Sequence, residues 1–231
     1  LVVDKDNHRL LLVSREGETT TYAGTGEPGH RDGPVATATF NSPNSVVFAP
    51  DGTAFVSVGN DIRAFSPEGG VSTLAGTGWP GFADGTGAAA RFYSPTGMAL
   101  GPAAGCLNLA DYRNHRVRRV SREGGVTTGA GTGEAGFRAG PVAAARFHRP
   151  AAGAVSSDGV VYVADSHNQR VRQIRDGIVS TLAGDGAKLM REGVGEAASI
   201  CGSISLYLDA RRGLLYVGTA VSVVTIAMTT P

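Results

Sequence analysis

The chain has 231 residues, a formal net charge of +1, 42% hydrophobic residues and 34 glycines. The balanced charge argues against nucleic-acid binding, and no apolar run approaches the ~18 residues that a membrane-spanning helix needs. Glycine is about twice as frequent as in an average protein, which disfavours long helices and favours many tight turns. The two cysteines, Cys106 and Cys201, form no CxxC motif and no disulfide framework, so they do not indicate the cellular compartment of the protein.

The sequence repeats itself with a period of just over 50 residues. An Ala-Gly step recurs at residues 23, 75, 130 and 183, so the spacings are 52, 55 and 53 residues. In the same register, three copies continue with a phenylalanine and, three residues later, a proline, whereas the fourth copy has Ile200 and Ser203. We expect the three phenylalanines to pack between successive repeats: they are Phe40, Phe92 and Phe147.

Each repeat predicts four short antiparallel strands separated by glycine-centred turns. First strands are expected at 45–48, 97–100 and 204–208, and second strands at 54–58, 107–110, 160–164 and 214–217. A third strand is expected at 171–174, and fourth strands at 71–74 and 179–182. Four strands in about 50 residues predict an all-β fold of four-stranded β-propeller blades. The connection between blades contains an Ala-rich stretch, for which we expect one helical turn.

Three segments then identify a family. Asp4-Lys5-Asp6-Asn7-His8-Arg9-Leu10, Asp111-Tyr112-Arg113-Asn114-His115-Arg116-Val117 and Asp165-Ser166-His167-Asn168-Gln169-Arg170-Val171 resemble the signature of NHL repeats. The resemblance covers nearly the whole chain and implies a propeller, commonly of six blades. The second unit shortens the motif to residues 59–63, and the last unit, around 218–221, lacks it.

We therefore expect residues 1–231 to form a single NHL-like propeller domain of about four to five blades that is incomplete at both ends. Partial blades are expected at 1–24 and 203–228, and complete repeats at about 43–76, 95–131 and 150–184. This pattern predicts part of a six-bladed ring in a longer polypeptide. The alternative is a smaller ring that is closed by pairing of the two ends.

An aspartate precedes an arginine by five residues in each copy of the motif. We expect each carboxylate to accept backbone N–H groups of the turn and to pair with its arginine. The expected pairs are Asp4–Arg9, Asp111–Arg116 and Asp165–Arg170. The alternative, a cation site built from Asp4, Asp6 and Asn7, lacks the number of ligands that calcium requires.

The histidines raise the question of a metal-dependent enzyme. In NHL-like lyases, histidines from several blades hold zinc, and His8 and His115 share one position of the motif here. Non-catalytic members carry the same motif, and zinc needs three convergent ligands. We expect no catalytic residue, metal or cofactor; a metal-dependent lyase or hydrolase working at the propeller channel is the alternative.

The most distinctive surface candidate is Trp79, because the matching positions of two other copies are glutamates. An exposed tryptophan in a loop is typical of a protein–protein contact, although it would also be explained by packing of Trp79 on its own loop. The further candidates for partner binding are Phe82, Arg31, Arg113 and Arg138. The predicted function is a non-catalytic scaffold that binds protein partners in a larger complex. Single-stranded RNA binding by the loops is a second alternative, disfavoured by the mixed charge and by an aromatic content of 6%.

Overall fold

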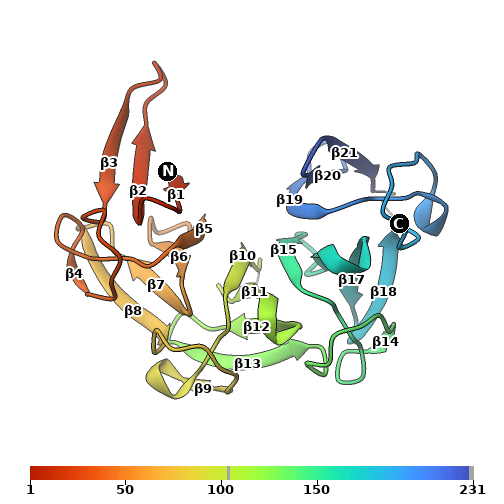
Figure 1. Ribbon diagram of the computed structural model, residues 1–231, viewed down its shortest axis with the longest axis horizontal. Helices are drawn as coiled ribbons and strands as arrows, with labels where there is room; N and C mark the ends of the chain where they lie inside the picture. Colours follow the sequence, from red (N-terminus) through yellow and green to blue (C-terminus); the bar gives the residue numbers. More distant parts are fainter. Residues whose placement is uncertain (103–104, 229–231) are drawn as a thin grey trace. The chain divides into compact units, whose positions relative to one another are not determined.

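The computed structural model describes residues 1–102 and 105–228, which form an all-β fold (Figure 1). In these residues the strands form five antiparallel sheets, and the helical segments are four single 3₁₀ turns. No helix within the described ranges has the length and apolar character that crossing a membrane requires. The predicted fold class, all-β with small antiparallel blades, is confirmed.

The chain divides into two compact units. The first comprises Leu1–Thr96 and Ser121–Val126, and the second comprises Gly97–Val120 and Thr127–Pro231.

The first unit begins with a three-stranded sheet of order β1-β2-β3, followed by a five-stranded sheet of order β4-β8-β7-β6-β5. The strands of the three-stranded sheet are β1 (Val2–Asp4), β2 (Arg9–Val13) and β3 (Thr19–Ala23). Those of the five-stranded sheet are β4 (Gly33–Pro34), β5 (Pro43–Phe48), β6 (Ala54–Val58), β7 (Asp61–Phe65) and β8 (Gly70–Gly76). Strands β5 to β8 are the four strands expected of a blade. The short β4 belongs to the connection that precedes the blade and pairs with its outer strand β8.

The middle sheet repeats this plan with the order β10-β11-β12-β13-β9. Its elements are β9 (Gly85–Thr86), η1 (Gly87–Ala89), β10 (Pro95–Leu100), β11 (Leu107–Asp111), η2 (Tyr112–Asn114), β12 (Arg116–Val120) and β13 (Gly125–Ala130). The 3₁₀ turn η1 lies in the Ala-rich connection, as the sequence predicted.

The second unit continues with a five-stranded sheet of order β14-β18-β17-β16-β15 and ends in a three-stranded sheet of order β19-β20-β21. The elements of the former are β14 (Gly140–Pro141), β15 (Pro150–Val155), β16 (Val161–Asp165), η3 (Ser166–Asn168), β17 (Arg170–Arg175) and β18 (Ile178–Ala183). Those that follow are η4 (Gly195–Ala197), β19 (Ser203–Asp209), β20 (Leu214–Thr219) and β21 (Val223–Ala227).

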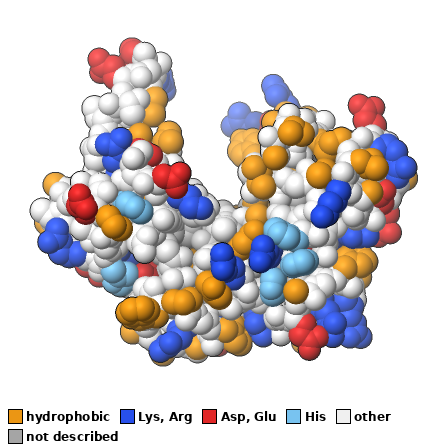
Figure 2. Space-filling model, in the orientation of Figure 1, with side chains coloured by type: hydrophobic (Ala, Val, Ile, Leu, Met, Phe, Trp, Pro, Cys, Tyr) orange, Lys and Arg blue, Asp and Glu red, His pale blue; other side chains and the backbone are white. Residues whose placement is uncertain are grey.

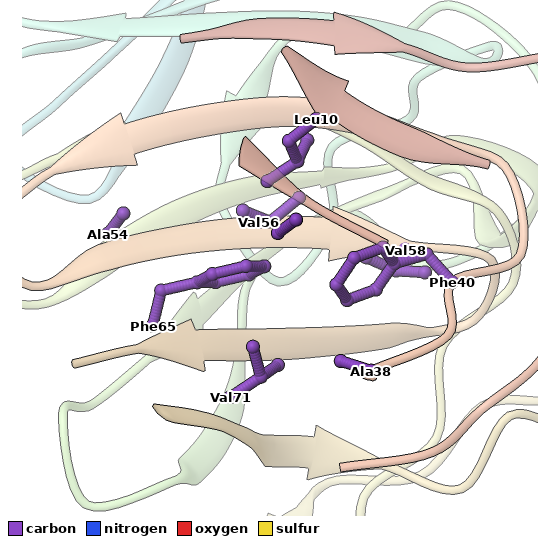
Figure 3. Packing of buried hydrophobic residues seen from close by; sticks show 9 residues of the cluster. Leu10, Ala38, Phe40, Ala54, Val56, Val58, Phe65 and Val71 are labelled. Atoms are coloured by element: carbon purple, nitrogen blue, oxygen red, sulfur yellow. The ribbon is translucent and has the colours of Figure 1, made fainter. Parts of the chain in front are cut away.

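The core of the first unit lies where the connection from one blade packs on the next blade. Phe40 is completely buried and its ring lies 5.6 Å from that of Phe65 on β7, while Leu10, Val56 and Val58 surround the pair (Figure 3). Full burial of a phenylalanine contributes about 1.5–3 kcal/mol to the free energy of unfolding. Position 40 therefore joins two blades through a shared apolar cluster.

The same position joins blades elsewhere in the chain. Phe92 and Phe147 are also completely buried, and Ile200 is 2% exposed. In the second unit Phe147 packs among Val117, Ala145 and Val163. Phe40 and Phe147 thus pack between successive repeats, and Phe92 is buried at the matching position.

Candidate functional site

A completely buried arginine occupies the same position of the third strand in three blades. Arg118 Nη1 lies 2.8 Å from Asp111 Oδ2, and Arg172 Nη1 lies 3.1 Å from Asp165 Oδ2. All four side chains are fully buried. A buried guanidinium needs a matched carboxylate, so these pairs belong to the interior of the blades and not to a surface site.

The structure corrects part of the expected pairing. Asp4 does pair with Arg9, at 2.8 Å, but Asp165 pairs with Arg172, seven residues away, instead of Arg170. Arg170 donates to the carbonyl oxygens of Asn168 and Asp185, at 2.8 and 2.6 Å.

The reason for the correction is the two-residue period of a strand, which places residues 170 and 172 on the same face. Arg172, the more deeply buried of the two arginines, pairs with the carboxylate of Asp165. The second motif copy has the same arrangement, because Asp111 pairs with Arg118 while Arg116 donates to the carbonyls of Asn114 and Thr132. The first copy has Leu11 at the position of Arg118 and Arg172, so Asp4 pairs with Arg9 instead.

The shortened motif of the second blade has different charged pairs. Val58 replaces the motif aspartate, and the buried Arg63 is paired instead with Asp32 of the preceding connection. Asp61 stands where the fourth blade has Arg170, and it pairs with His30, which stands where that blade has Phe137. Burial is the main influence on Asp61 and raises the pKa of its carboxyl group. Although this repeat lacks the motif aspartate, Arg63 and Asp61 therefore both have charged or titratable partners within the same unit.

A hydrogen bond from a backbone N–H group of one repeat to a side chain of the preceding repeat recurs four times among the described residues. The acceptor side chain follows the motif turn, and the donor is the N–H group of the residue directly before the proline or serine that begins the first strand of the next blade. The four bonds are Ser42 N–H to His8 Nδ1 (3.0 Å), Ser94 N–H to Asn60 Oδ1 (2.9 Å), Arg149 N–H to His115 Nδ1 (3.0 Å) and Gly202 N–H to Gln169 Oε1 (2.6 Å). We call these bonds the interblade latches. They give His8 and His115, which the sequence had left open as zinc ligands, a structural role.

Trp79 projects from the loop after β8, and 73% of its surface is exposed. The base of this loop is fixed, because Asn60 Nδ2 donates to the Gly78 carbonyl at 2.9 Å and the Gly78 N–H donates to Asp61 Oδ1. The Gly81 N–H then donates to the Phe92 carbonyl at 2.9 Å. The alternative in which the indole packs away on its own loop does not fit this exposure.

The other candidates for partner binding are all exposed but differ in how they are held. Arg31 donates through Nε and Nη2 to the Thr37 carbonyl of its own loop, so its guanidinium is engaged. Phe82 is 44% exposed. Arg113 lies in η2 and Arg138 lies in the connection before β14. Arg31 and Phe82 belong to the first unit, Arg113 and Arg138 to the second.

Three histidines of the second unit lie together, which the sequence analysis missed. The rings of His115 and His148 are 5.5 Å apart between centroids, and those of His148 and His167 are 4.9 Å apart. Arg149 Nη1 lies 3.3 Å from His167 Nε2, and its guanidinium lies 5.7 Å from the ring of Tyr112. We call these five residues the histidine cluster.

Burial and neighbouring positive groups act together on the histidine cluster. Burial is the largest influence and, with Arg149, lowers the pKa of His115, His148 and His167 below the ordinary histidine value. The cluster is therefore mostly neutral at neutral pH, apart from its arginine. In the described part of the chain, no group of three or more His, Cys, Asp or Glu side chains is arranged to hold a metal ion. Both cysteines are free thiols.

Comparison with known proteins supports the resemblance seen in the motifs. The family model described as NHL repeat matches residues 147–174, which include β16, η3 and most of β17. NHL repeat-containing protein 2 of Homo sapiens is 26% identical over 258 residues, covering 94% of this chain and 35% of the human protein. The chain belongs to the NHL-repeat β-propeller family.

This NHL propeller is also similar to a plant protein. Protein SUPPRESSOR OF QUENCHING 1, chloroplastic, of Arabidopsis thaliana is 32% identical over 175 residues, which cover 69% of this chain and 16% of the plant protein. The chain thus spans about a third of the human relative and about a sixth of the plant relative.

Solved structures share the fold of this NHL propeller at low sequence identity. An auxiliary nutrient binding protein from Bacteroides thetaiotaomicron matches with a TM-score of 0.67 and 16% identity, covering 93% of this chain and 51% of the other. The nidogen/laminin complex matches with a TM-score of 0.64 and 14% identity, covering 96% and 72%. A virginiamycin B lyase from Staphylococcus aureus matches with a TM-score of 0.54 and 11% identity, covering 98% and 65%. Binding proteins and an enzyme thus share this fold.

Proposed function

We propose that this NHL propeller is a non-catalytic platform that binds a protein partner through the Trp79 loop within a larger assembly. The observation that carries the proposal is the 73% exposure of Trp79 on a loop with a fixed base. Buried tryptophans are among the residues that contribute most to protein–protein affinity.

The fixed base of the loop favours binding. A loop that is already ordered loses less conformational entropy when a partner covers it than a mobile loop would. The hydrogen bonds of Gly78 and Gly81 hold both sides of Trp79 and Pro80 in place. The indole is therefore presented in a defined position.

A cavity of about 240 Å³ adjoins the same loop in the first unit. Its walls include Pro80, Tyr93 and Asn60, and Lys5 also contributes. A side chain of the partner that enters this cavity would be next to the tryptophan. Such an arrangement combines an apolar anchor with a polar rim, as in many protein interfaces.

The internal repeat indicates that the tryptophan is not needed for folding. The matching positions hold Glu27, Glu134 and Ala187, so the blade accepts a charged or a small residue there. An exposed large aromatic side chain at such a position is more readily explained by recognition than by packing.

The proposal is tested by affinity capture from an extract of the source organism with the 231-residue chain as bait. Trp79→Glu is the test variant, because glutamate occupies this position in two other repeats. Val194→Thr is the matched control, because Val194 is 90% exposed and Thr86 occupies its position in another repeat.

We expect the unchanged chain and Val194→Thr to retain one partner in stoichiometric amount. Trp79→Glu should reduce its recovery by about tenfold or more, as for an interface residue worth over ~1.4 kcal/mol. Equal recovery with Trp79→Glu, for a chain whose circular dichroism is unchanged, would place the contact elsewhere and overturn the proposal.

A further inference from the structure

We infer that the histidine cluster binds a phosphate group, which would be a second binding site, separate from the proposed partner contact at Trp79. Figure 2 shows histidine side chains beside basic side chains on one face of the molecule. Tyr112, His115, His148, Arg149 and His167 all belong to the second unit, whereas Trp79 belongs to the first.

The latch orients one donor of the cluster. His115 Nδ1 accepts the N–H of Arg149, so the neutral imidazole carries its proton on Nε2. This N–H remains on the side of the ring away from the latch. The T-shaped contact between the two rings places the imidazole of His148 next to that of His115.

Arg149 is held in place from two sides. Its backbone is in the left-handed region (φ 51°) and is fixed by the latch, while its Nη1 contacts His167 Nε2. A guanidinium has five N–H donors, so donors of Arg149 remain beyond the one directed at His167. The imidazoles of His115 and His148 and the guanidinium of Arg149 therefore lie close to one another in the cluster.

The charges around the cluster favour an anion. Arg149 lowers the pKa of all three histidines, and Arg116 and Lys188 act in the same direction on His115 and His167. Asp165 is a carboxylate that contacts the cluster: its Oδ1 accepts a hydrogen bond from the backbone N–H of His148. Asp165 is fully buried and paired with Arg172, so its charge is already matched. The positive charges of Arg149, Arg116 and Lys188 near the cluster therefore favour an anion over a metal cation.

A doubly charged, tetrahedral oxyanion fits better than a singly charged one. Residues with N–H donors come together from three separate segments, namely η2 with the start of β12, the residues before β15, and η3. Binding a dianion would raise the histidine pKa values, because an opposite charge nearby favours the protonated imidazole. The imidazoles then take up protons when the dianion binds.

Other repeats show that the cluster is dispensable for the fold. The positions of His148 and Arg149 hold Asn41 and Ser42 in one repeat, and Tyr93 and Ser94 in the next. Ser42, Ser94 and Arg149 all have the same φ of 51°. His148→Asn and Arg149→Ser therefore reproduce residues that the same backbone already carries.

The test is isothermal titration calorimetry of the full 231-residue chain at low ionic strength. The ligands are inorganic phosphate, a short phosphoserine peptide and the same peptide without phosphate. Each is titrated at about pH 6 and about pH 8, on either side of the ordinary histidine pKa. The variants are His148→Asn and Arg149→Ser, and the control is His8→Gln, which alters a histidine outside the cluster and keeps a latch acceptor.

We expect at least one phosphate-bearing ligand to bind at one or both pH values. Loss of one charge-assisted hydrogen bond should weaken binding about tenfold in each variant, whereas His8→Gln should leave it unchanged. Tighter binding of the phosphopeptide would identify a phosphorylated protein as the source of the group, and equal or tighter binding of inorganic phosphate would identify the free ion. The inference would be overturned if neither inorganic phosphate nor the phosphopeptide bound. It would also be overturned if His148→Asn and Arg149→Ser bound the ligand as tightly as the unchanged chain does. Neither result depends on Trp79.

Discussion

The backbone N–H of Arg149 donates a hydrogen bond to Nδ1 of His115 at 3.0 Å, although 34 residues separate the two in the sequence. His8 and Ser42 form the same bond at the same separation and distance. Because donor and acceptor come from successive repeats, each bond fixes the start of one blade against the motif turn of the previous one. His8 and His115, which in the sequence suggested a metal site, thus stabilise the contact between successive blades.

The latch predicts that the acceptor atom matters more than the histidine itself. His8→Gln should leave the free energy of unfolding near that of the unchanged chain, because Gln169 performs this role in another repeat. His8→Ala should lower it by about 1 kcal/mol or more, since the part-buried Ser42 N–H loses its acceptor. Urea denaturation followed by circular dichroism measures both. Both substitutions keep a non-glycine residue at φ 54°, so the strain of this backbone conformation is the same in the two variants. Equal free energies of unfolding for His8→Gln and His8→Ala would show that the hydrogen bond contributes nothing.

The buried pair of Asp165 and Arg172 predicts strong coupling between two substitutions. Arg172→Met alone should destabilise the fold by about 3–5 kcal/mol, because it leaves a buried carboxylate without its counter-charge. Adding Asp165→Asn to that variant should recover part of the loss, since the amide is neutral and still accepts a hydrogen bond from the His148 N–H.

A double-mutant cycle on the urea unfolding of the four chains gives the interaction energy directly. The two changes should be far from additive. Additive losses would mean that Arg172 and Asp165 do not depend on each other, contrary to the pairing that the structure shows.

The histidine cluster predicts a loss of stability in mild acid. The folded-state pKa of each of its three histidines lies below the ordinary value, so the unfolded chain takes up protons first as the pH falls. The free energy of unfolding should therefore decrease between about pH 7 and about pH 5.

Asp165 acts in the opposite direction within part of the same range. Burial raises its pKa to about 6, so the folded chain binds that proton before the unfolded chain does, and this group favours the folded state as the pH falls towards 4. Comparison of variants separates the two effects. His148→Asn should flatten the histidine-dependent slope in thermal unfolding measured at several pH values, whereas an unchanged slope would contradict the assignment.

The sequence predicted the strands well because turns and apolar runs alternate so regularly. The second strand expected at 54–58 is β6 to the residue, and the other predicted strands lie within observed strands or extend past them by a residue at one end. Phe40 and Phe147 were placed correctly between repeats for the same reason: their position recurs in register. The local sequence pattern of apolar runs and turns was sufficient to predict these strands and the two buried phenylalanines.

The partners of individual side chains were harder to predict. Arg170 and Arg172 lie on the same face of one strand, and only depth in the sheet decides which of them meets Asp165. The histidine cluster depends on residues from three separate segments that are brought together by the packing of successive blades. His148 and His167 have different positions in the repeat, so no spacing in the sequence marks them as neighbours.

The platform proposal is tested most directly by the fluorescence of Trp79, which is the single tryptophan of the chain. In the free chain its emission should be that of an exposed indole and should be readily quenched by acrylamide, in keeping with its 73% exposure. On addition of a captured partner that lacks tryptophan, or in which the tryptophans have been replaced, we predict a shift of the emission to shorter wavelength and a several-fold loss of quenching. Unchanged emission and quenching in a complex that has formed would show that the partner does not cover Trp79, and would contradict the proposed function.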